Sequence, residues 1–373
     1  MGIFRDERFP SMRLLFVITN LSGGGAEKST VKLLEGLAGR GHEVHLLLLE
    51  NKIVYTVPSG VRVHVLLPAG RRLSSGWVAK RVMALRLRAW YRHMTATAHF
   101  DLSISALPYA DEMVRLAHLG NCCHQIHHML SGEIRQLSLK SPRKAARRLN
   151  RYRKLYSGRR LIAVSEGIAR DLSDTVGVTN SSIVIIHNPF DFNEIRQLSL
   201  FLEPDLPKEP YIIHVGRFSM QKRHDLLLTA FAESHIPHLL VLLTDPVPQL
   251  VEMIESRGLT SRVIIAGFRN NPYPWYARAL ALVLSSDYEG MPNVLVEALA
   301  CGVPVVSTAC GSGASEILAG PMRHFLVPCG DVARLAQAIR DVVQSPPIID
   351  PGLLSAFSSE DVIGKIESLA IGE

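Results

Sequence analysis

Short apolar runs alternate with amphipathic stretches along most of the chain. Runs bounded by glycine, proline or polar residues are expected to be strands, while spacings such as Val31, Leu34 and Leu37 predict a helix over residues 26–37. Strands are expected at 12–19, the end of 36–50, 61–67, 100–107, 122–126, 161–164, 183–186, 211–215, 239–244, 263–266, 279–284 and 303–307. Such alternation is typical of parallel sheets covered by helices, so the sequence predicts an α/β protein.

The chain of 373 residues has room for two domains of ordinary size. A segment rich in acids and prolines, residues 193–210, interrupts the alternation and is expected to be a linker. It would separate an N-terminal domain over residues 12–192 from a C-terminal domain over 211–350. A C-terminal tail, residues 351–373, can then pack back on the N-terminal domain.

The stretch 285–318, SSDYEGMPNVLVEALACGVPVVSTACGSGASEIL, carries the clearest chemical pattern. It follows an apolar strand, and it begins with a polar turn. Pro292 is well placed as a first helical residue, and residues 293–300 read as a short helix that Gly302 and Pro304 end. A second strand and a glycine turn follow. A strand, a polar loop and a helix N-terminus in this order outline a phosphate site.

The helix N-terminus and two carboxylates suggest what such a site would bind. The free N–H groups of Asn293, Val294 and Leu295 would point at an anion, and the helix dipole would help to hold it. A carboxylate is repelled by a phosphate, so Glu297 is expected to accept hydrogen bonds from ribose hydroxyls and Glu289 from those of a sugar. The simpler interpretation is two exposed glutamates beside a core helix.

This stretch resembles the donor site of the retaining glycosyltransferases of family 4, in their bacterial polysaccharide and glycolipid branch. Glu289 and Glu297 have the Glu-x7-Glu spacing of that family, although Ala314 stands where proline is expected. The resemblance implies the GT-B fold, in which two Rossmann-like domains face each other across a cleft, with the acceptor on the N-terminal side and the nucleotide sugar on the C-terminal side. It also implies that the donor contacts Gly290, Met291, Pro292, Asn293, Val294 and Leu295.

Two cations follow the first strand of the C-terminal half. Arg217 and Lys222 lie on the loop after residues 211–215 and match the arginine and lysine with which the family holds the donor phosphates. A diphosphate leaving group gains charge as the glycosidic bond breaks, so cations there act most strongly in the transition state. The chain has no Asp-x-Asp motif of metal-dependent sugar transferases, so no metal is expected.

A glycine loop, SGGGAEKST, joins the first strand to the first helix. Gly24 and Gly25 let the backbone approach a ligand closely, and the resemblance implies that this loop faces the donor phosphates and the acceptor. Two other motifs fail here. A P-loop requires glycine where Glu27 stands, and the dinucleotide fingerprint requires glycine where Lys28 stands.

Three histidines lie in the segment CCHQIHH. The strand 122–126 would place His127 and His128 at its carboxyl end, where ligands bind in open α/β sheets. The family has a histidine after such a strand, near the donor sugar, and His127 matches it best, before His128 and His124. His42, after a glycine turn, is expected to be structural.

Basic residues are concentrated in two runs, within a net charge of +7. Residues 71–92 hold seven Lys or Arg and residues 135–160 hold eleven, with no acid in either run and aromatic residues among them. These runs favour an anionic membrane surface. A nucleic-acid surface and a plain solvated helix face are the competing interpretations.

Several observations bear on location. No apolar run reaches the roughly 18 residues of a membrane span, and the N-terminus lacks the apolar core of a signal peptide. The five cysteines form no Cys-x-x-Cys pair, which is typical of reduced thiols in a cytosolic protein. The sequence therefore predicts a cytoplasmic protein, peripheral at the inner face of the plasma membrane.

The sequence and its resemblance together predict a metal-independent enzyme without a cofactor. It would move a hexose or N-acetylhexosamine from a nucleotide sugar, preferably a UDP-sugar, to a hydroxyl of a lipid-linked or cell-surface glycan, with retention. The expected catalytic residues are His127, Glu289, Arg217 and Lys222. A GT-B epimerase or hydrolase is one alternative, and a basic adaptor for membranes or nucleic acid is another. Nucleic acid is not expected, because an adaptor does not need the intact set of Arg217, Lys222, Glu289 and Glu297.

Overall fold

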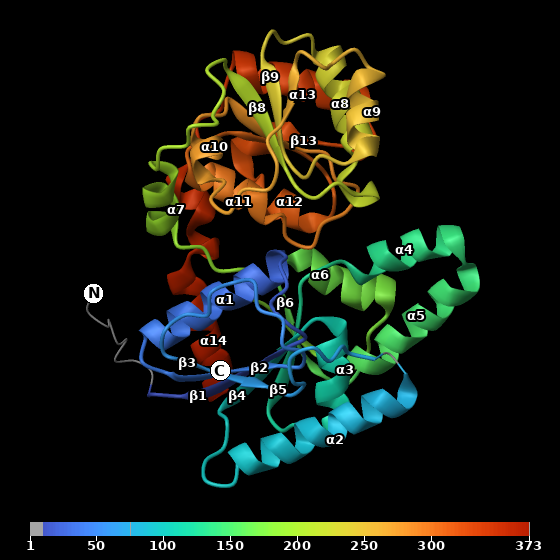
Figure 1. The fold of residues 1–373 in the computed structure, drawn as a ribbon, viewed down its shortest axis with the longest axis vertical. Helices are drawn as coiled ribbons and strands as arrows, with labels where there is room; N and C mark the ends of the chain where they lie inside the picture. The colour runs from blue at the N-terminus through green and yellow to red at the C-terminus, as the bar shows by residue number, and fades with distance from the viewer. Residues whose placement is uncertain (1–9, 75, 373) are drawn as a thin grey trace. The chain divides into compact units, whose positions relative to one another are not determined.

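The computed structural model describes residues 10–74 and 76–372. The chain forms two compact units (Figure 1). Unit 1 runs to Pro189 and includes the end of the chain from Ser359, and unit 2 is Phe190–Ser358. Each unit is built on one parallel sheet with helices between its strands, so the predicted α/β class with two Rossmann-like domains is confirmed.

Unit 1 contains a seven-stranded parallel sheet in the order β3-β2-β1-β4-β5-β6-β7. Its strands are β1(Arg13–Ile18), β2(Glu43–Leu48), β3(Val61–Val65), β4(Leu102–Ala106), β5(Cys122–Ile126), β6(Arg160–Ala163) and β7(Ser182–Ile185). Its helices are α1(Gly25–Gly39), α2(Trp77–Met94), α3(Pro108–Ala117), α4(Leu130–Lys140), α5(Pro142–Tyr156), α6(Glu166–Arg170), the π-helix η1(Asp171–Val176) and α14(Ser359–Ile371).

Both faces of the unit 1 sheet are buried along its inner strands, whereas the edge strands β3 and β7 are partly exposed. In β1, Leu14 and Phe16 belong to an apolar cluster with residues of α1 and α14, whereas Leu15 and Val17 belong to a second cluster with residues of α2 and α3. Successive residues of a strand point to opposite faces, so each face has its own core. Burial on both faces explains why an inner strand such as β1 appears in the sequence as an unbroken apolar run.

Helix α14 packs against α1 in unit 1. Gly36 allows the close approach, because a side chain there would collide with Ile363. The buried carboxylate of Glu367 accepts from Arg40 Nη1 at 2.5 Å and lies 2.8 Å from His42 Nε2. His42 therefore has the structural role expected for it.

Unit 2 contains a six-stranded parallel sheet in the order β10-β9-β8-β11-β12-β13. Its strands are β8(Tyr211–Val215), β9(Leu239–Leu243), β10(Val263–Ile265), β11(Ala281–Leu284), β12(Val305–Thr308) and β13(Leu326–Val327). Its helices are α7(Phe192–Ser199), α8(His224–Ser234), α9(Pro248–Glu255), α10(Tyr273–Ala277), α11(Asn293–Ala300), α12(Ser312–Ile317) and α13(Val332–Gln344), with 3-10 turns η2(Met220–Lys222), η3(Gly320–Phe325) and η4(Pro351–Phe357).

The structure divides the chain at other residues than the sequence analysis expected. The expected linker, 193–210, begins with α7, which lies in unit 2 and buries Ile195. Asp191 caps this helix by accepting from the Glu194 amide at 2.9 Å. The expected tail, 351–373, is divided between the units. Its first element, the 3-10 turn η4, belongs to unit 2, and the chain enters unit 1 at Ser359. Acids and prolines marked the segment as irregular, but the capping and apolar residues at its start form a helix.

Candidate functional site

The candidate site of unit 2 lies where the order of its strands changes direction. Counting from β8, the chain first builds outward through β9 to β10, and then returns to build from β11 outward on the other side. Loops after β8 and β11 therefore leave the sheet as neighbours at its carboxyl edge, which is the usual ligand position in such sheets. Lys222 lies on the first loop, and the second is residues 285–290, here called the 285–290 loop.

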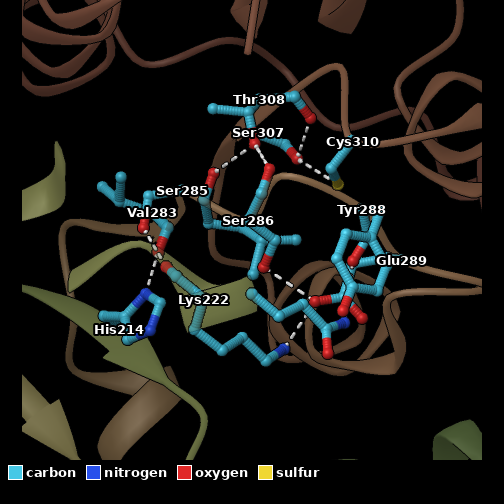
Figure 2. A network of polar contacts seen from close by, with 12 residues as sticks. His214, Lys222, Val283, Ser285, Ser286, Tyr288, Glu289, Ser307, Thr308 and Cys310 are labelled. Atoms are coloured by element: carbon cyan, nitrogen blue, oxygen red, sulfur yellow. Dashed lines mark hydrogen bonds and ion pairs between the residues drawn. The ribbon is translucent and has the colours of Figure 1, made fainter. Parts of the chain in front are cut away.

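An ion pair joins these two loops (Figure 2). Lys222 Nζ lies 2.7 Å from Glu289 Oε1, and the two side chains are 17% and 12% exposed. The Ser286 hydroxyl donates to the same carboxylate oxygen, also at 2.7 Å. Two of the sequence-predicted site residues are thus in direct contact, and the charge of each is compensated inside a largely buried network.

Backbone contacts hold this pair in place. The Ser285 hydroxyl donates to the Lys222 carbonyl at 2.7 Å, and the Thr308 hydroxyl at the end of β12 donates to the Ser286 carbonyl at 2.5 Å (Figure 2). The Glu289 amide donates to a carbonyl in the loop after β12 at 2.6 Å. Three adjacent strand ends therefore fix the positions of both charged side chains. Sequence analysis missed the serines and the threonine, because nothing in their spacing marks them.

Two buried histidines lie next to Lys222. His214 Nδ1 is 2.9 Å from the Val283 carbonyl (Figure 2). The His214 and His224 rings meet edge to face, with their centroids 4.8 Å apart. Burial lowers the pKa of His214 well below its usual value and lowers that of His224 to about 4, and the Lys222 charge contributes to both shifts. Both rings are neutral near pH 7, so neither adds a positive charge beside Lys222.

Gly313 brings the start of α12 against the 285–290 loop. A Cβ at this position would lie 2.5 Å from the Gly290 carbonyl oxygen and 3.1 Å from Met291 Cα. Both are backbone atoms and cannot move aside as a flexible side chain would. The glycine turn seen in the sequence is therefore required for packing, and Gly290, Met291 and Pro292 are all buried.

The backbone amides at the start of α11 were expected to be free, but two of them donate hydrogen bonds within the chain. Pro292 is the residue before the helix, with φ −78° and ψ 85°, and Asn293 is the first helical residue. The Asn293 amide donates to the Met291 carbonyl and the Leu295 amide to the Pro292 carbonyl, both at 3.0 Å. The prediction that these two N–H groups are free is wrong in this structure, because the tight turn into the helix uses them. Val294, between them, is partly exposed.

Glu297 is buried, with 5% of its surface exposed. Its Oε2 accepts a hydrogen bond from the Tyr276 hydroxyl of α10 at 3.2 Å. Burial, followed by the Glu297 charge, raises the pKa of Tyr276 well above its usual value, so the phenol keeps its proton. The carboxylate thus accepts from a hydroxyl, and sequence analysis did not find this partner. The simpler interpretation of an exposed glutamate does not hold.

Arg217, by contrast, is exposed on the loop after β8. Within the described residues its guanidinium makes no hydrogen bond or ion pair. Arg223 on the same segment reaches the 285–290 loop, with Nη1 2.9 Å from Asp287 Oδ1. Arg217 therefore remains available to a ligand, while Arg223 strengthens the link between the two loops.

In unit 1, the predicted glycine loop lies at the corresponding change of strand order, after β1. Helix α1 begins at Gly25, and Gly24 precedes it in an extended conformation that any residue can adopt. The Gly24 amide donates to the Tyr55 hydroxyl at 3.2 Å. The backbone at this loop is thus held by an aromatic residue that the sequence did not single out.

The three histidines of the CCHQIHH segment have different surroundings. His124 is buried, with Nδ1 2.7 Å from the Ser105 hydroxyl, so it belongs to the core. His128 is partly exposed and lies 3.8 Å from Glu133. The ring nitrogens of His127 are buried at the end of β5, and burial lowers the pKa of this residue to about 3, which contact with Asn188 only partly offsets. His127 therefore has a neutral ring near pH 7.

The two basic runs form helices of unit 1. Residues 71–92 include most of α2, and residues 135–160 include α5. On α2, the side chains of Met83, Ala84 and Leu87 are buried, whereas four apolar side chains face outward: Trp77 (71% exposed), Val78 (64%), Val82 (43%) and Leu85 (64%). Exposed apolar and basic residues on one helix are typical of a membrane-surface helix. Within the described residues, no helix combines the length and apolar character that a membrane span requires.

Comparison with known proteins covers both units. Residues 23–194 match the family model described as Glycosyltransferase Family 4, and residues 209–345 match that described as Glycosyl transferases group 1. The chain is 28% identical over 339 residues to the N-acetylgalactosamine-N,N'-diacetylbacillosaminyl-diphospho-undecaprenol 4-alpha-N-acetylgalactosaminyltransferase of Campylobacter jejuni. That match covers 89% of this chain and 90% of the relative.

Solved structures share the fold. Sucrose-phosphate synthase from Thermosynechococcus elongatus superimposes with a TM-score of 0.76 at 20% identity, over 96% of this chain and 98% of the other. HepE from Anabaena, solved in complex with UDP and glucose, has a TM-score of 0.73 at 20% identity, over 97% and 100% of the two chains. With the two parallel sheets, these likenesses confirm the predicted GT-B fold.

Proposed function

The chain belongs to the glycosyltransferases of family 4, and from this premise we propose that it moves a hexose or N-acetylhexosamine from a nucleoside diphosphate sugar to a hydroxyl of a lipid-linked or cell-surface glycan. The observation that carries the proposal is the Lys222–Glu289 pair, which joins the loops after β8 and β11 at the change of strand order. This arrangement places a cation and a hydroxyl-accepting carboxylate side by side, as a phosphate and its attached sugar require.

Donor binding would use the cations and carboxylates of unit 2. Arg217 and Lys222 bind the diphosphate and stabilise the charge that grows on it as the glycosidic bond breaks. Lys222 can turn from Glu289 to the phosphates, which leaves the Glu289 carboxylate to accept from the sugar hydroxyls. Glu297 accepts from the ribose. With two cations on the phosphates, the reaction needs no metal. UDP is the preferred nucleotide, in keeping with the solved HepE complex.

The reaction would proceed with retention at the anomeric carbon, by attack of the acceptor on the face that the diphosphate leaves. A phosphate oxygen then takes the proton of the acceptor hydroxyl, so no protein nucleophile is needed. His127 is the proposed participant from unit 1. With a pKa of about 3 its ring is neutral, so it acts as a hydrogen-bond donor and not as a proton donor.

The proposed acceptor is attached to a lipid. The Campylobacter relative acts, by its name, on a diphospho-undecaprenol glycan. In this chain, the outward apolar residues and the cations of α2 suit the headgroup level of an anionic bilayer, such as the inner face of the plasma membrane. We therefore propose peripheral membrane binding, with unit 1 as the acceptor side.

Thermal unfolding with UDP, GDP and ADP tests the proposal. A nucleotide at 100 times its dissociation constant adds about 2.7 kcal/mol to stability. One nucleotide should raise the unfolding temperature of the wild type but not of Glu297→Gln, while Glu252→Gln, an exposed glutamate of unit 2, responds as the wild type does. Sugars of that nucleotide are then incubated with lipid-linked acceptors.

The outcomes separate the alternatives. Transfer to an acceptor supports the proposal, whereas release of free sugar or UDP without an acceptor indicates a hydrolase or epimerase. If no nucleotide stabilises the wild type, the donor site as described does not exist, and a non-catalytic adaptor becomes the better interpretation.

A further inference from the structure

Unit 1 contains a cationic cavity outside the candidate site. It has a volume of about 290 Å³ and lies between α3 and α5. Its lining includes four cations and one carboxylate, which are Arg115, Arg147, Arg151, Lys154 and Glu112. These five residues are here called the α3–α5 pocket. None of them belongs to the site proposed for the nucleotide sugar.

Helical spacing explains why these side chains meet. Arg147, Arg151 and Lys154 follow one another on α5 at intervals of four and three residues, so they lie on one face of the helix. Glu112 and Arg115 are three residues apart on α3 and likewise share a face. Arg115 lies outside the basic run at 135–160, so the sequence did not associate it with the cations of α5.

The carboxylate of the pocket is already paired. Glu112 Oε2 lies 2.7 Å from Lys80 Nζ of α2, and Arg151 Nη2 also contacts it. Glu112 is shared between these two cations, so it cannot compensate the others. Within the described residues, the charged groups of Arg115, Arg147 and Lys154 make no hydrogen bond or ion pair. The pocket therefore collects at least three uncompensated positive charges around one cavity.

We propose that the α3–α5 pocket binds a phosphate-bearing group. Cations that converge without carboxylate partners repel one another, and an anion between them removes this cost. Guanidinium groups present planar pairs of donors that match phosphate oxygens, and three of the lining cations are arginines. The volume suits a phosphate or diphosphate rather than a complete nucleotide sugar. This inference goes beyond the proposed function, because it does not depend on a sugar donor.

The test separates a formed pocket from a diffuse basic surface. Arg147→Gln/Lys154→Gln removes two uncompensated pocket cations. Arg143→Gln/Lys144→Gln removes two exposed cations from the same helix that do not line the pocket. Binding of inorganic diphosphate to the full chain is measured by calorimetry. Diphosphate that also occupies unit 2 contributes equally to both variants, so their difference reports the pocket.

We expect the pocket variant to bind diphosphate about tenfold more weakly or worse, because each lost charge-assisted hydrogen bond is worth about a factor of ten. The Arg143/Lys144 variant should change by less than about twofold. Glu112→Gln should tighten binding, because it removes the carboxylate and releases Arg151. Equal losses of diphosphate binding in the two double variants would overturn the proposal. It would also be overturned if the pocket variant weakened neither diphosphate binding nor vesicle binding.

A second arm identifies the source of the phosphate. Binding to phosphatidylcholine vesicles is compared with and without phosphatidylglycerol. If the pocket variant loses more vesicle binding than the control variant, the group is a lipid headgroup; if it loses only diphosphate binding, the group is soluble or acceptor-borne. Stabilisation by UDP should be equal in all these variants, so a failure of the pocket and a failure of the proposed donor site can be told apart.

Discussion

Lys222→Met removes the cation of the central ion pair and keeps most of the aliphatic stem. At 2.7 Å and an effective dielectric constant of about 20, the direct attraction between Lys222 and Glu289 is about 6 kcal/mol, which desolvation largely offsets. Removing one partner of a buried pair costs about 3–5 kcal/mol, because the other charge stays uncompensated. Ser286 still donates to Glu289, so we expect about 2–3 kcal/mol here.

The chain offers a matched control. Lys365 Nζ lies at the same 2.7 Å from Asp361 Oδ2, but both side chains are 41% exposed. Lys365→Met should cost less than about 1 kcal/mol, because solvent screens an exposed pair. Urea unfolding, followed through the transition of each unit, measures both losses, and Lys222→Met/Glu289→Gln should lose less than the sum of its single changes.

Sugar transfer gives a second readout of the same variant. If Lys222 binds the leaving diphosphate, Lys222→Met should lower kcat by about a hundredfold or more. A loss of stability no larger than that of Lys365→Met would refute the reasoning that burial makes this pair important. Normal transfer by a folded Lys222→Met variant would refute its role at the phosphates.

Three further predictions follow from packing, titration and exposure. Gly313→Ala should destabilise unit 2 by about 1–3 kcal/mol, because the new Cβ would lie 2.5 Å from a backbone carbonyl oxygen. Gly364→Ala in α14 is the control: its Cβ meets nothing within 4 Å, so it should stabilise the protein by about 0.5–1 kcal/mol. Chemical unfolding measures both changes. Burial lowers the pKa of His224 from 6.5 to about 4, so the unfolded chain binds the proton more tightly than the folded chain does. The free energy of unfolding should therefore fall by up to about 3 kcal/mol as the pH drops from 6.5 towards 4. In His224→Gln, unfolding measured across this pH range should show a smaller fall. Trp77→Ser/Leu85→Ser should weaken binding to anionic vesicles in a flotation assay while changing the unfolding temperature little, because both side chains already face outward; unchanged flotation would exclude α2 as the membrane surface.

Local pattern was sufficient for the elements around the candidate site. The predicted helix at 293–300 coincides with α11, because Pro292 before it and Gly302 after it mark both ends. The strand predicted at 122–126 coincides with β5. The sequence did not reveal α7 at the start of the expected linker, residues 193–210, because a capped helix of two turns has too few apolar positions to show a period.

Contacts between distant segments escaped the sequence for a physical reason. Tyr276 reaches Glu297 from another helix, and the two histidines beside Lys222 come from β8 and α8. Spacing along one element reveals which residues share a face, but not which face of another element they meet. The α3–α5 pocket is a further case, because Arg115 joins the cations of α5 only after the helices pack.

The sequence by itself determined the alternation of strands and helices, the two Rossmann-like domains and the family, because apolar periodicity and short glycine, proline and glutamate motifs are local properties. Tertiary structure alone decided where the chain crosses between units, that the amides of Asn293 and Leu295 are occupied, and that Lys222 pairs with Glu289. These depend on the order of strands in a sheet and on the burial of charge, which arise only when segments far apart in the chain come together.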